Sequence, residues 1–318
     1  MSFMTFVARR LAWVIGIMVL VSFLVFSLLA ASPGSVVATL LGARPATPEA
    51  IEQVTAQYHL DSPFLVQYWD WAKSALSGDF GRSIQSGQTV TSDIASHLTI
   101  TLQLALYALV LVLALGITIG IVAGIRQGSL FDRATSGLSV LGMSAPGFVV
   151  SILLSYLFGV LVSIFPVYGG GNGDFTDRVE HLTLPAVALA VGMIALIVRQ
   201  TRAAVGDVVD QDYVTFARAR GLNLRRITLH YVLRNAAAPV VNTGGLLAIH
   251  LVSGAVLVES VFALGGVGQL MVQSVESKDI PVVQGLAFFI ALFVVCINLL
   301  VDVVTLILDP RTRDGVRR

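Results

Sequence analysis

The sequence has 318 residues, of which 56% are hydrophobic and only 12% are charged, and its mean hydropathy is +0.84. Soluble chains carry about 25% charged residues. This composition excludes an ordinary water-soluble domain, because the chain could not cover its own surface with polar groups. It predicts an integral membrane protein.

Six apolar stretches are each long enough to cross a membrane as a helix, since about 20 helical residues span the hydrocarbon core. The third stretch is too long for one straight helix, and Pro146-Gly147 within it predicts a break. The first stretch follows two arginines, as a signal peptide would, but it is too long for a typical signal peptide. The sequence therefore predicts an all-α polytopic membrane protein with six transmembrane helices, at residues 11–31, 98–125, 134–165, 182–198, 236–258 and 280–301.

The basic residues are distributed unevenly between the two sides of the membrane that six spans define. One side carries 15 of the 20 Lys and Arg residues, and the other side carries 5. Basic residues concentrate in cytoplasmic loops. Both termini are therefore predicted to be cytoplasmic, and the segments at residues 32–97 and 166–181 are predicted to be external.

The external insertion at about residues 32–97 is too long for a simple connection and carries helix start signals. Thr47-Pro48-Glu49 has the pattern of an N-cap, a first-turn proline and a first-turn acid. Ser62-Pro63 starts a second helix, which Gly78 ends. Two short external helices are expected.

The cytoplasmic loop at about residues 199–235 is helical in composition, but its arginines keep it out of the hydrocarbon. Asp212 is predicted to cap a first helix that Gly221 ends in the left-handed conformation. Asn223 is predicted to cap a second helix that runs to Asn235. The two helices form a compact knob, which either docks on a protein or lies on anionic lipid headgroups. Small side chains near the glycine favour the protein dock.

Several segments, in order along nearly the whole chain, resemble one family. They are YVTFARARGL from Tyr213, SAPGF from Ser144, ESVFALGGVGQL from Glu259, DIPVVQG from Asp279 and NLLVDVVTLILDPRTR from Asn298. The chain resembles the inner-membrane permease subunits of binding-protein-dependent ABC importers, in the dipeptide, oligopeptide and nickel branch. The long external insertion resembles that of the B-type member of the permease pair.

The resemblance implies a permease domain over residues 1–318 that forms half of the translocation pathway of an ATP-driven importer, for di- or oligopeptides. The implied partners are a homologous second permease, two ABC ATPase subunits, an extracytoplasmic substrate-binding protein and the lipid bilayer, with no nucleic acid. ATP and magnesium would be bound by the ATPase subunits, so that this chain is not an enzyme and holds no cofactor or metal. It would be a multi-pass protein of the inner cell membrane.

The cytoplasmic loop then corresponds to the coupling loop that contacts an ATPase subunit. The candidate coupling residues combine apolar, small and basic side chains: Tyr213, Phe216, Ala217, Arg218, Ala219, Arg220, Gly221, Leu222, Arg225 and Arg226. The sequence departs from the general importer motif, since Thr215-Phe216-Ala217 replaces Glu-Ala-Ala. A carboxylate contact is therefore not expected there.

Polar residues in and after the fifth span are candidates for the pathway or the external gate. Asn242, His250 and Ser253 could line a cavity wall. Glu259 ends the span near the external side, where hydration is expected to lower the cost of its charge, and the resemblance suggests that it fixes the following turn. Gly265 stands where proline is common in this branch.

Other function classes have weaker support in the sequence. The chain contains no Gly-Lys pair and so no phosphate-binding loop of the P-loop type. Its five histidines lack metal-ligand spacing. A secondary transporter or channel without ATPase partners is the alternative, although no clear repeat between the halves supports it. An intramembrane enzyme that pairs Ser144 with His250 is a further alternative.

Overall fold

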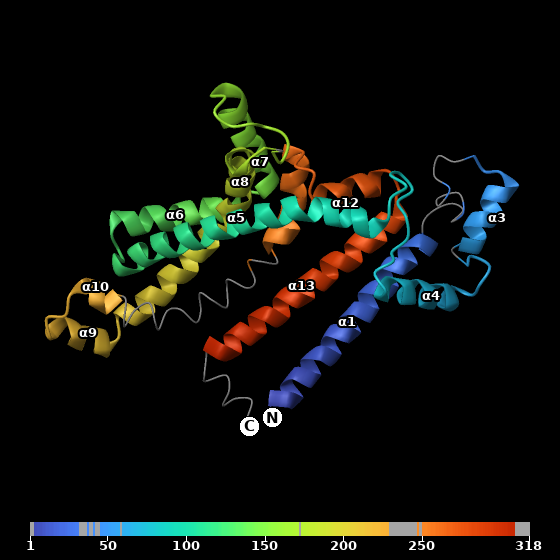
Figure 1. Cartoon of the computed structure of the whole chain (residues 1–318). Coiled ribbons are helices and arrows are strands. Elements are labelled where there is room, and N and C mark those ends of the chain that lie inside the picture. Colours follow the sequence, from blue (N-terminus) through green and yellow to red (C-terminus); the bar gives the residue numbers. More distant parts are fainter. Residues whose placement is uncertain are drawn as a thin grey trace. The chain divides into compact units, whose positions relative to one another are not determined.

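The computed structural model describes residues 3–31, 37, 41, 45–57, 59–171, 173–228, 247 and 250–308. These residues form helices joined by turns and short loops (Figure 1). The only strand-like pairing among them is one isolated antiparallel bridge between Arg82 and Thr89. The predicted all-α fold class is confirmed.

Three helices are long and apolar enough to cross a membrane: α5 (Val90–Ile125), α8 (Phe175–Val209) and α13 (Ile280–Leu308). Two pairs of shorter helices, each interrupted by a few residues, raise the number of candidate spans to five within the described residues. The N-terminal helix α1 (Phe3–Ala31) contains a shorter apolar segment. The count of six spans and the cytoplasmic location of both termini stay predictions.

The predicted break in the third apolar stretch is confirmed. Helix α6 (Leu130–Ser144) ends before Pro146, and α7 (Gly147–Leu154) begins after it and continues as the π-helix η1 (Ser155–Leu161). The two halves meet at an angle of 101°. The cause is local, because Ala145 has the extended conformation that a following proline imposes. In Figure 1, α7 and η1 project away from α6.

The chain divides into two compact units. The first comprises residues 1–99 and 266–296, and the second comprises residues 100–265 and 297–318. Helices α5 and α13 begin in the first unit and continue into the second. The assignment of residues 1–318 to a single permease domain stays a prediction.

Both expected helices of the insertion are present in the first unit. Helix α3 (Pro48–Gln57) begins where Thr47 accepts a hydrogen bond from the backbone of Ala50, at 3.2 Å. Helix α4 (Phe64–Leu76) is followed by Gly78 in the left-handed conformation, with φ of +85°. The local start and stop signals therefore determine these helices.

Aromatic side chains attach one face of α4 to α1. The ring of Tyr68 lies 5.3 Å from that of Phe23, and Trp71 lies 5.6 Å from Phe26. The Tyr68 hydroxyl also lies 2.9 Å from the hydroxyl of Ser22. Aromatic packing of this kind adds stability beyond the buried area. Part of the aromatic content of the insertion thus serves packing on the chain's own helices. The exposed apolar side chains of α4 are Leu65, Val66, Trp69 and Leu76.

In the second unit, three glycines spaced by four residues allow α5 to approach α8 closely. A side chain at Gly120 would place its Cβ 2.6 Å from the Cβ of Thr201 and 2.9 Å from the carbonyl oxygen of Val198. Gly116 and Gly124 are similarly close to α8. Small residues at this spacing are typical of tightly packed membrane helices. The α5–α8 contact therefore leaves no room for larger side chains.

We expect Gly120→Val to destabilise the protein, because the added side chain would separate α5 from α8, whereas Gly137→Val should have little effect. Gly137 lies in α6, and a Cβ there meets no atom within 4 Å. Overpacking costs about 1–3 kcal/mol. Thermal unfolding of the purified variants in detergent measures the difference. Equal stability of the two variants would contradict the close contact.

Candidate functional site

The coupling loop contains two short helices, α9 (Asp212–Ala219) and α10 (Leu224–Ile227). The prediction that Asp212 caps the first helix is wrong by one position, because Gln211 is the N-cap and makes no side-chain capping bond. Asp212 is instead the first helical residue, where the positive end of the helix dipole favours an acid. The predicted continuation of the second helix to Asn235 lies outside the described residues.

Gly221 ends α9 in the left-handed conformation, with φ of +75°, as predicted. The Gly221 N–H donates to the carbonyl oxygen of Arg218 at 2.9 Å, and the Leu222 N–H donates to that of Ala217 at 3.2 Å. These two bonds define a Schellman motif, which satisfies the last carbonyls of the helix. A Cβ at Gly221 would meet no described atom within 4 Å. A substitution there would strain the backbone without a clash inside the described chain.

The inner face of α9 attaches it to the end of α8. Val214 and Ala217 are buried in a cluster with Val205 of α8 and Ile227 of α10, and Leu222 packs against this cluster. Ala217 and Leu222 were expected to be contact points for a partner. They face the chain's own core instead. The helical period places Ala217 on the side of Val214, and Leu222, which follows the turn at Gly221, packs against the same cluster. The loop is therefore seated on α8 by a small apolar core of its own.

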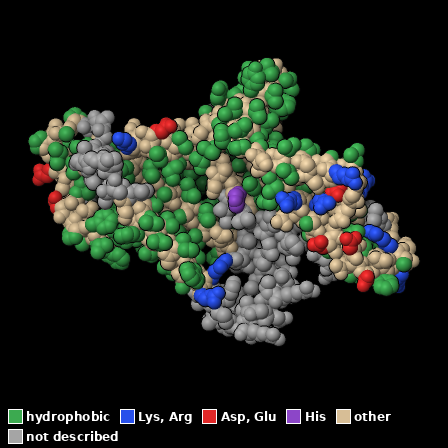
Figure 2. Space-filling model, turned by 180° about the vertical axis from the view of Figure 1, so that it is seen from behind, with side chains coloured by type: hydrophobic (Ala, Val, Ile, Leu, Met, Phe, Trp, Pro, Cys, Tyr) green, Lys and Arg blue, Asp and Glu red, His purple; other side chains and the backbone are tan. Residues whose placement is uncertain are grey.

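The outer face of α9 presents the remaining coupling residues. Tyr213 and Phe216 are exposed, Phe216 with 69% of its surface, and Ala219 follows on the same face. The side chain of Arg225 lies outside the described residues. Figure 2 shows charged side chains gathered at the end that carries α9 and α10, whereas hydrophobic side chains cover the projecting α7–η1 segment. Three of the candidate coupling arginines are exposed: Arg218, Arg220 and Arg226.

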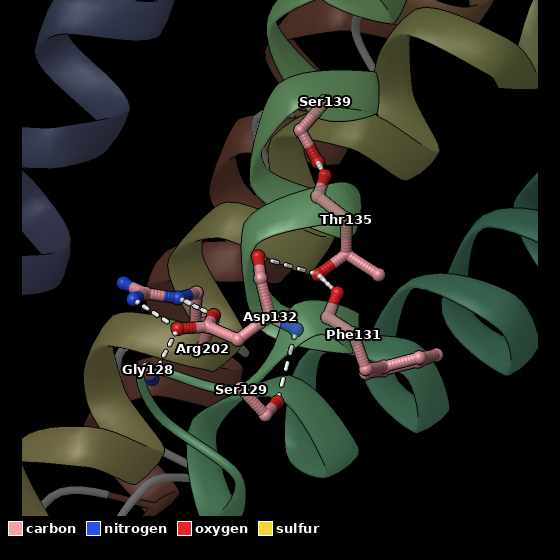
Figure 3. Close-up of polar contacts among 7 residues, drawn as sticks. All are labelled: Gly128, Ser129, Phe131, Asp132, Thr135, Ser139 and Arg202. Carbon is pink, nitrogen blue, oxygen red and sulfur yellow. Dashed lines mark hydrogen bonds and ion pairs between the residues drawn. The ribbon is translucent and has the colours of Figure 1, made fainter.

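An ion pair joins α8 to α6 close to the coupling loop (Figure 3). Arg202 of α8 donates from Nε to Oδ1 of Asp132 and from Nη2 to Oδ2, the second bond at 2.9 Å. The Gly128 N–H also donates to Oδ2, at 2.9 Å, and the hydroxyl of Ser129 caps α6 by accepting from the Asp132 N–H. Asp132 is only 3% exposed. The arrangement is a bidentate, charge-assisted pair in a nearly buried position.

The hydrogen bond from Arg202 holds the pKa of Asp132 at about 2, below its ordinary value of 3.8, with a further lowering from the Gly128 bond. Burial acts in the opposite direction but is the smaller effect. Asp132 precedes the predicted span at residues 134–165, and Arg202 follows the predicted span at residues 182–198. Both residues therefore lie outside the predicted spans. Because the folded-state pKa of Asp132 is lowered, the ion pair contributes its full folding stability above the unfolded-state pKa. This contribution is lost as the pH falls through the folded-state pKa of about 2.

This pair could not be predicted from the sequence. Arg202 contributes there only as a cytoplasmic charge, and Asp132 is 70 residues away in the chain. A local signal was present, since Ser129 followed by an acid three residues later is a helix-start pattern. That pattern locates the start of α6 but does not name the partner on α8.

We expect Asp132→Asn to lower the free energy of unfolding by about 1.5–3 kcal/mol, the value of a hydrogen bond to a charged group. Asp207→Asn is the matched control, because Asp207 is an exposed acid on α8, the helix that carries Arg202. Thermal unfolding in detergent at pH 5, 6.5 and 8 measures both. The loss should be the same at all three values, since Asp132 stays ionised throughout. A loss that disappears at pH 5 would contradict the lowered pKa.

The candidate pathway residues fall on different faces of the helix His250–Phe262. His250 and Ser253 are exposed and share one face, as their spacing of three residues requires. Glu259 is completely buried, with 0% exposure. Asn242 lies outside the described residues. The structure therefore does not group Glu259 with the other two.

Glu259 is stabilised by a buried partner and not by hydration, which corrects the expectation from the sequence. The hydroxyl of Thr101, on α5, donates to its Oε1 at 2.7 Å, and both side chains are buried. The backbone carbonyl of Glu259 also accepts the Leu264 N–H at 3.1 Å, so the residue contributes to the turn that follows. In that turn Gly265 has a φ of +74°. Proline cannot adopt this value, because its ring fixes φ near −65°.

Ser144, the serine of the alternative enzyme site, has a structural partner. Its hydroxyl donates to the carbonyl oxygen of Val140, one turn earlier in α6, at 2.9 Å. Serines commonly make this bond within membrane helices. It gives the side chain a structural explanation that requires no catalytic role.

The chain matches two family profiles that together cover most of its length. The "Binding-protein-dependent transport system inner membrane component" profile matches residues 116–314, and the corresponding N-terminal profile matches residues 3–105. A putative peptide transport system permease protein of Brucella abortus (strain 2308) is 36% identical over 311 residues, which cover 96% of this chain and 98% of the relative. The dipeptide transport system permease protein DppB of Escherichia coli (strain K12) is 33% identical over 333 residues, which cover 97% of this chain and 98% of the relative.

A solved structure also resembles the fold. It is the MetNI methionine ABC transporter in inward-facing conformations, with a TM-score of 0.54 and 18% sequence identity, and the match covers 68% of this chain and 96% of the other. At this identity the likeness concerns the fold alone. The family matches over nearly the whole length establish that the chain belongs to the inner-membrane components of binding-protein-dependent transport systems, as a multi-pass permease subunit of an ABC importer.

Proposed function

We propose that this chain forms half of the translocation pathway of an ATP-driven importer of di- or oligopeptides. The observation that carries the proposal is the outer face of α9, where Tyr213 and Phe216 are exposed while the inner face packs on α8 through a shared apolar cluster. A rigidly seated, exposed aromatic face suits a protein contact, since aromatic and arginine residues are enriched in interfaces. Peptides are the proposed cargo because the similar permeases carry peptide and dipeptide transport in their names.

The proposed assembly contains a homologous second permease, two ABC ATPase subunits and an extracytoplasmic binding protein. ATP and magnesium would be bound by the ATPase subunits. Movement of an ATPase subunit would displace α9, and α8 would follow because Val214 and Ala217 are buried against it. The Asp132–Arg202 pair ties α8 to α6, so α6 would move with it. The energy of ATP would thus reach the spans as a rigid-body displacement.

The alternative use of the coupling loop, binding to lipid headgroups, has less support from this geometry. A helix that lies on a membrane buries a continuous apolar face in the lipid. In α9 the apolar residues Val214 and Ala217 already face the chain's own core. The outer face then offers only Tyr213 and Phe216 as large apolar contacts. A secondary transporter or channel would likewise leave this face without a purpose.

The remaining site residues have proposed roles on the pathway. His250 and Ser253 are proposed to line a polar wall, because both lie on the exposed face of their helix. Asn242 is proposed for the same wall from its sequence position. Glu259 is proposed to hold the turn after its helix, through its bonds to Thr101 and Leu264.

We expect Gly221→Val to abolish peptide uptake while the membrane part stays folded. A β-branched residue is strained at a positive φ by about 1–3 kcal/mol, and its side chain would project from the docking face. Gly78→Val is the matched control, because Gly78 ends α4 with the same pair of backbone bonds and no atom within 4 Å of a Cβ. Uptake of a labelled dipeptide by proteoliposomes containing the complete importer measures the effect.

The two glycine variants separate strain from docking. Similar losses of thermal stability are expected, whereas only Gly221→Val should release the ATPase subunits or uncouple them. Normal uptake by Gly221→Val would overturn the coupling role of the loop.

We expect at least one of Arg218→Lys, Arg220→Lys, Arg225→Lys and Arg226→Lys to reduce transport-coupled ATP hydrolysis by about tenfold. Lysine keeps the positive charge but loses the planar fork that makes bidentate hydrogen bonds to acidic groups. ATPase activity of the assembled complex, with and without binding protein and dipeptide, measures the coupling. If all four variants hydrolyse ATP normally while the alanine variants leave liposomes in a salt-dependent manner, the loop binds lipid and the docking proposal fails.

A further inference from the structure

The first unit contains a polar cavity of about 370 Å³ that the proposed function has not used. It is formed by the turn at residues 83–86, the start of α5, the helix α12 (Val267–Glu276) and the start of α13. Its charged and titratable lining residues are Asp93, His97 and Asp279. Among the described residues, no Lys or Arg lines it.

Asp279 is the most buried acid in the lining, at 2% exposure. Its Oδ2 accepts from the Ser83 hydroxyl at 2.6 Å and from the Gln85 N–H at 3.1 Å. Its Oδ1 is also buried but accepts no hydrogen bond from any residue in the described part of the chain. A buried carboxylate oxygen without a donor is costly. The described residues therefore leave this oxygen without the donor that it needs.

A second carboxylate is held by the same turn. The hydroxyl of Ser86 donates to Oδ2 of Asp93 at 2.8 Å, and Asp93 is buried. The Ser86 N–H in turn donates to the Ser83 hydroxyl at 2.9 Å. The turn thus positions both acids, and among the described residues neither is paired with Lys or Arg. Within the described residues, the two acids of the cavity wall thus have no Lys or Arg partner.

The histidine adds a further acceptor. Nδ1 of His97 lies 2.7 Å from the backbone carbonyl oxygen of Asp93. A carbonyl oxygen only accepts, so this bond places the proton of the neutral ring on Nδ1 and leaves Nε2 with a lone pair. The titratable groups of the wall therefore offer hydrogen-bond acceptors to a ligand.

We propose that this cavity binds the primary ammonium group at the amino terminus of the transported peptide. An ammonium carries a positive charge and three donors with no acceptor, which matches a wall of two carboxylates and an imidazole nitrogen. A volume of about 370 Å³ is larger than a bare ion needs and lies within the range of small-molecule pockets. No three His, Cys, Asp or Glu side chains among the described residues come together as metal ligands. The identity of the ligand as a peptide rests on the proposed function.

The test uses the purified importer complex in nanodiscs, without the binding protein, and two probes, dialanine and N-acetyl-dialanine. Acetylation removes the charge and two donors from the amino terminus. Dialanine is expected to bind at least about tenfold more tightly than the acetylated probe, as expected for a charge-assisted hydrogen bond. Isothermal titration calorimetry measures both affinities.

Asp279→Asn keeps the shape of the side chain but removes its charge, and it should weaken dialanine binding by at least about tenfold. Asp70→Asn is the matched control in the same unit, because Asp70 is exposed on α4 and lies beside Lys73, away from the cavity lining. It should leave dialanine binding unchanged. Ser83→Ala removes the bond to Oδ2 but keeps the charge of Asp279, so it should retain the preference for dialanine over the acetylated probe.

Three results would overturn the inference. The first is equal binding of the two probes by the wild-type complex. The second is dialanine binding that Asp279→Asn does not change, with Asp93→Asn deciding the question if Asp279→Asn does not assemble. The third is Asp279-dependent binding of calcium chloride without any binding of dialanine, which would make the cavity a metal site.

A failure of the ammonium site can be distinguished from a failure of the proposed peptide import. Uptake of labelled dialanine is measured in parallel with the complete importer and its binding protein. If dialanine is taken up but its binding is unchanged by Asp279→Asn, the cavity is refuted as the ammonium site and peptide import is supported. If Asp279→Asn weakens dialanine binding but the wild-type importer takes up no dialanine, the cavity is supported as an ammonium site and the peptide is refuted as cargo.

Discussion

The contact between α5 and α8 is the constraint on which the second unit depends. Two transmembrane helices in lipid have little hydrophobic driving force to associate, so their association relies on close packing. The glycine row provides that packing, since Gly120 brings α5 within van der Waals distance of Val198 and Thr201. The same helix α8 then continues to the Asp132–Arg202 pair and to the apolar seat of α9. One packed helix thus supports both the membrane part and the coupling loop.

Much of the local structure could be predicted from the sequence, because its signals are local. Pro146-Gly147 predicted the break between α6 and α7, and Gly221 predicted the left-handed end of α9. Tertiary pairs could not be predicted in this way. The bond between Ser83 and Asp279 joins residues 196 positions apart, and no periodicity relates them. Glu259 was placed in a hydrated position because the sequence does not reveal that Thr101 is its buried partner.

The coupling residues show a different limit of sequence reasoning. Helix α9 has only eight residues, so its inner and outer faces each hold two or three side chains. Composition identifies the loop as a contact region but does not show which residues lie on the inner face of α9 and which lie on the outer face. The structure assigns Val214 and Ala217 to the inner face and Phe216 to the outer face. The assignment follows from the position of α8, which a single sequence does not report.

The turn that contains Gly265 has a consequence for comparing this permease with its relatives. The resemblance suggests that proline is common at this position, and a backbone with φ of +74° cannot accept one. A relative with proline must therefore follow a different path through the turn. Chimaeras between such permeases should exchange residues 259–270 as one block, because the bonds of Glu259 and the conformation of Gly265 belong together. A junction placed inside this block would combine two incompatible backbones.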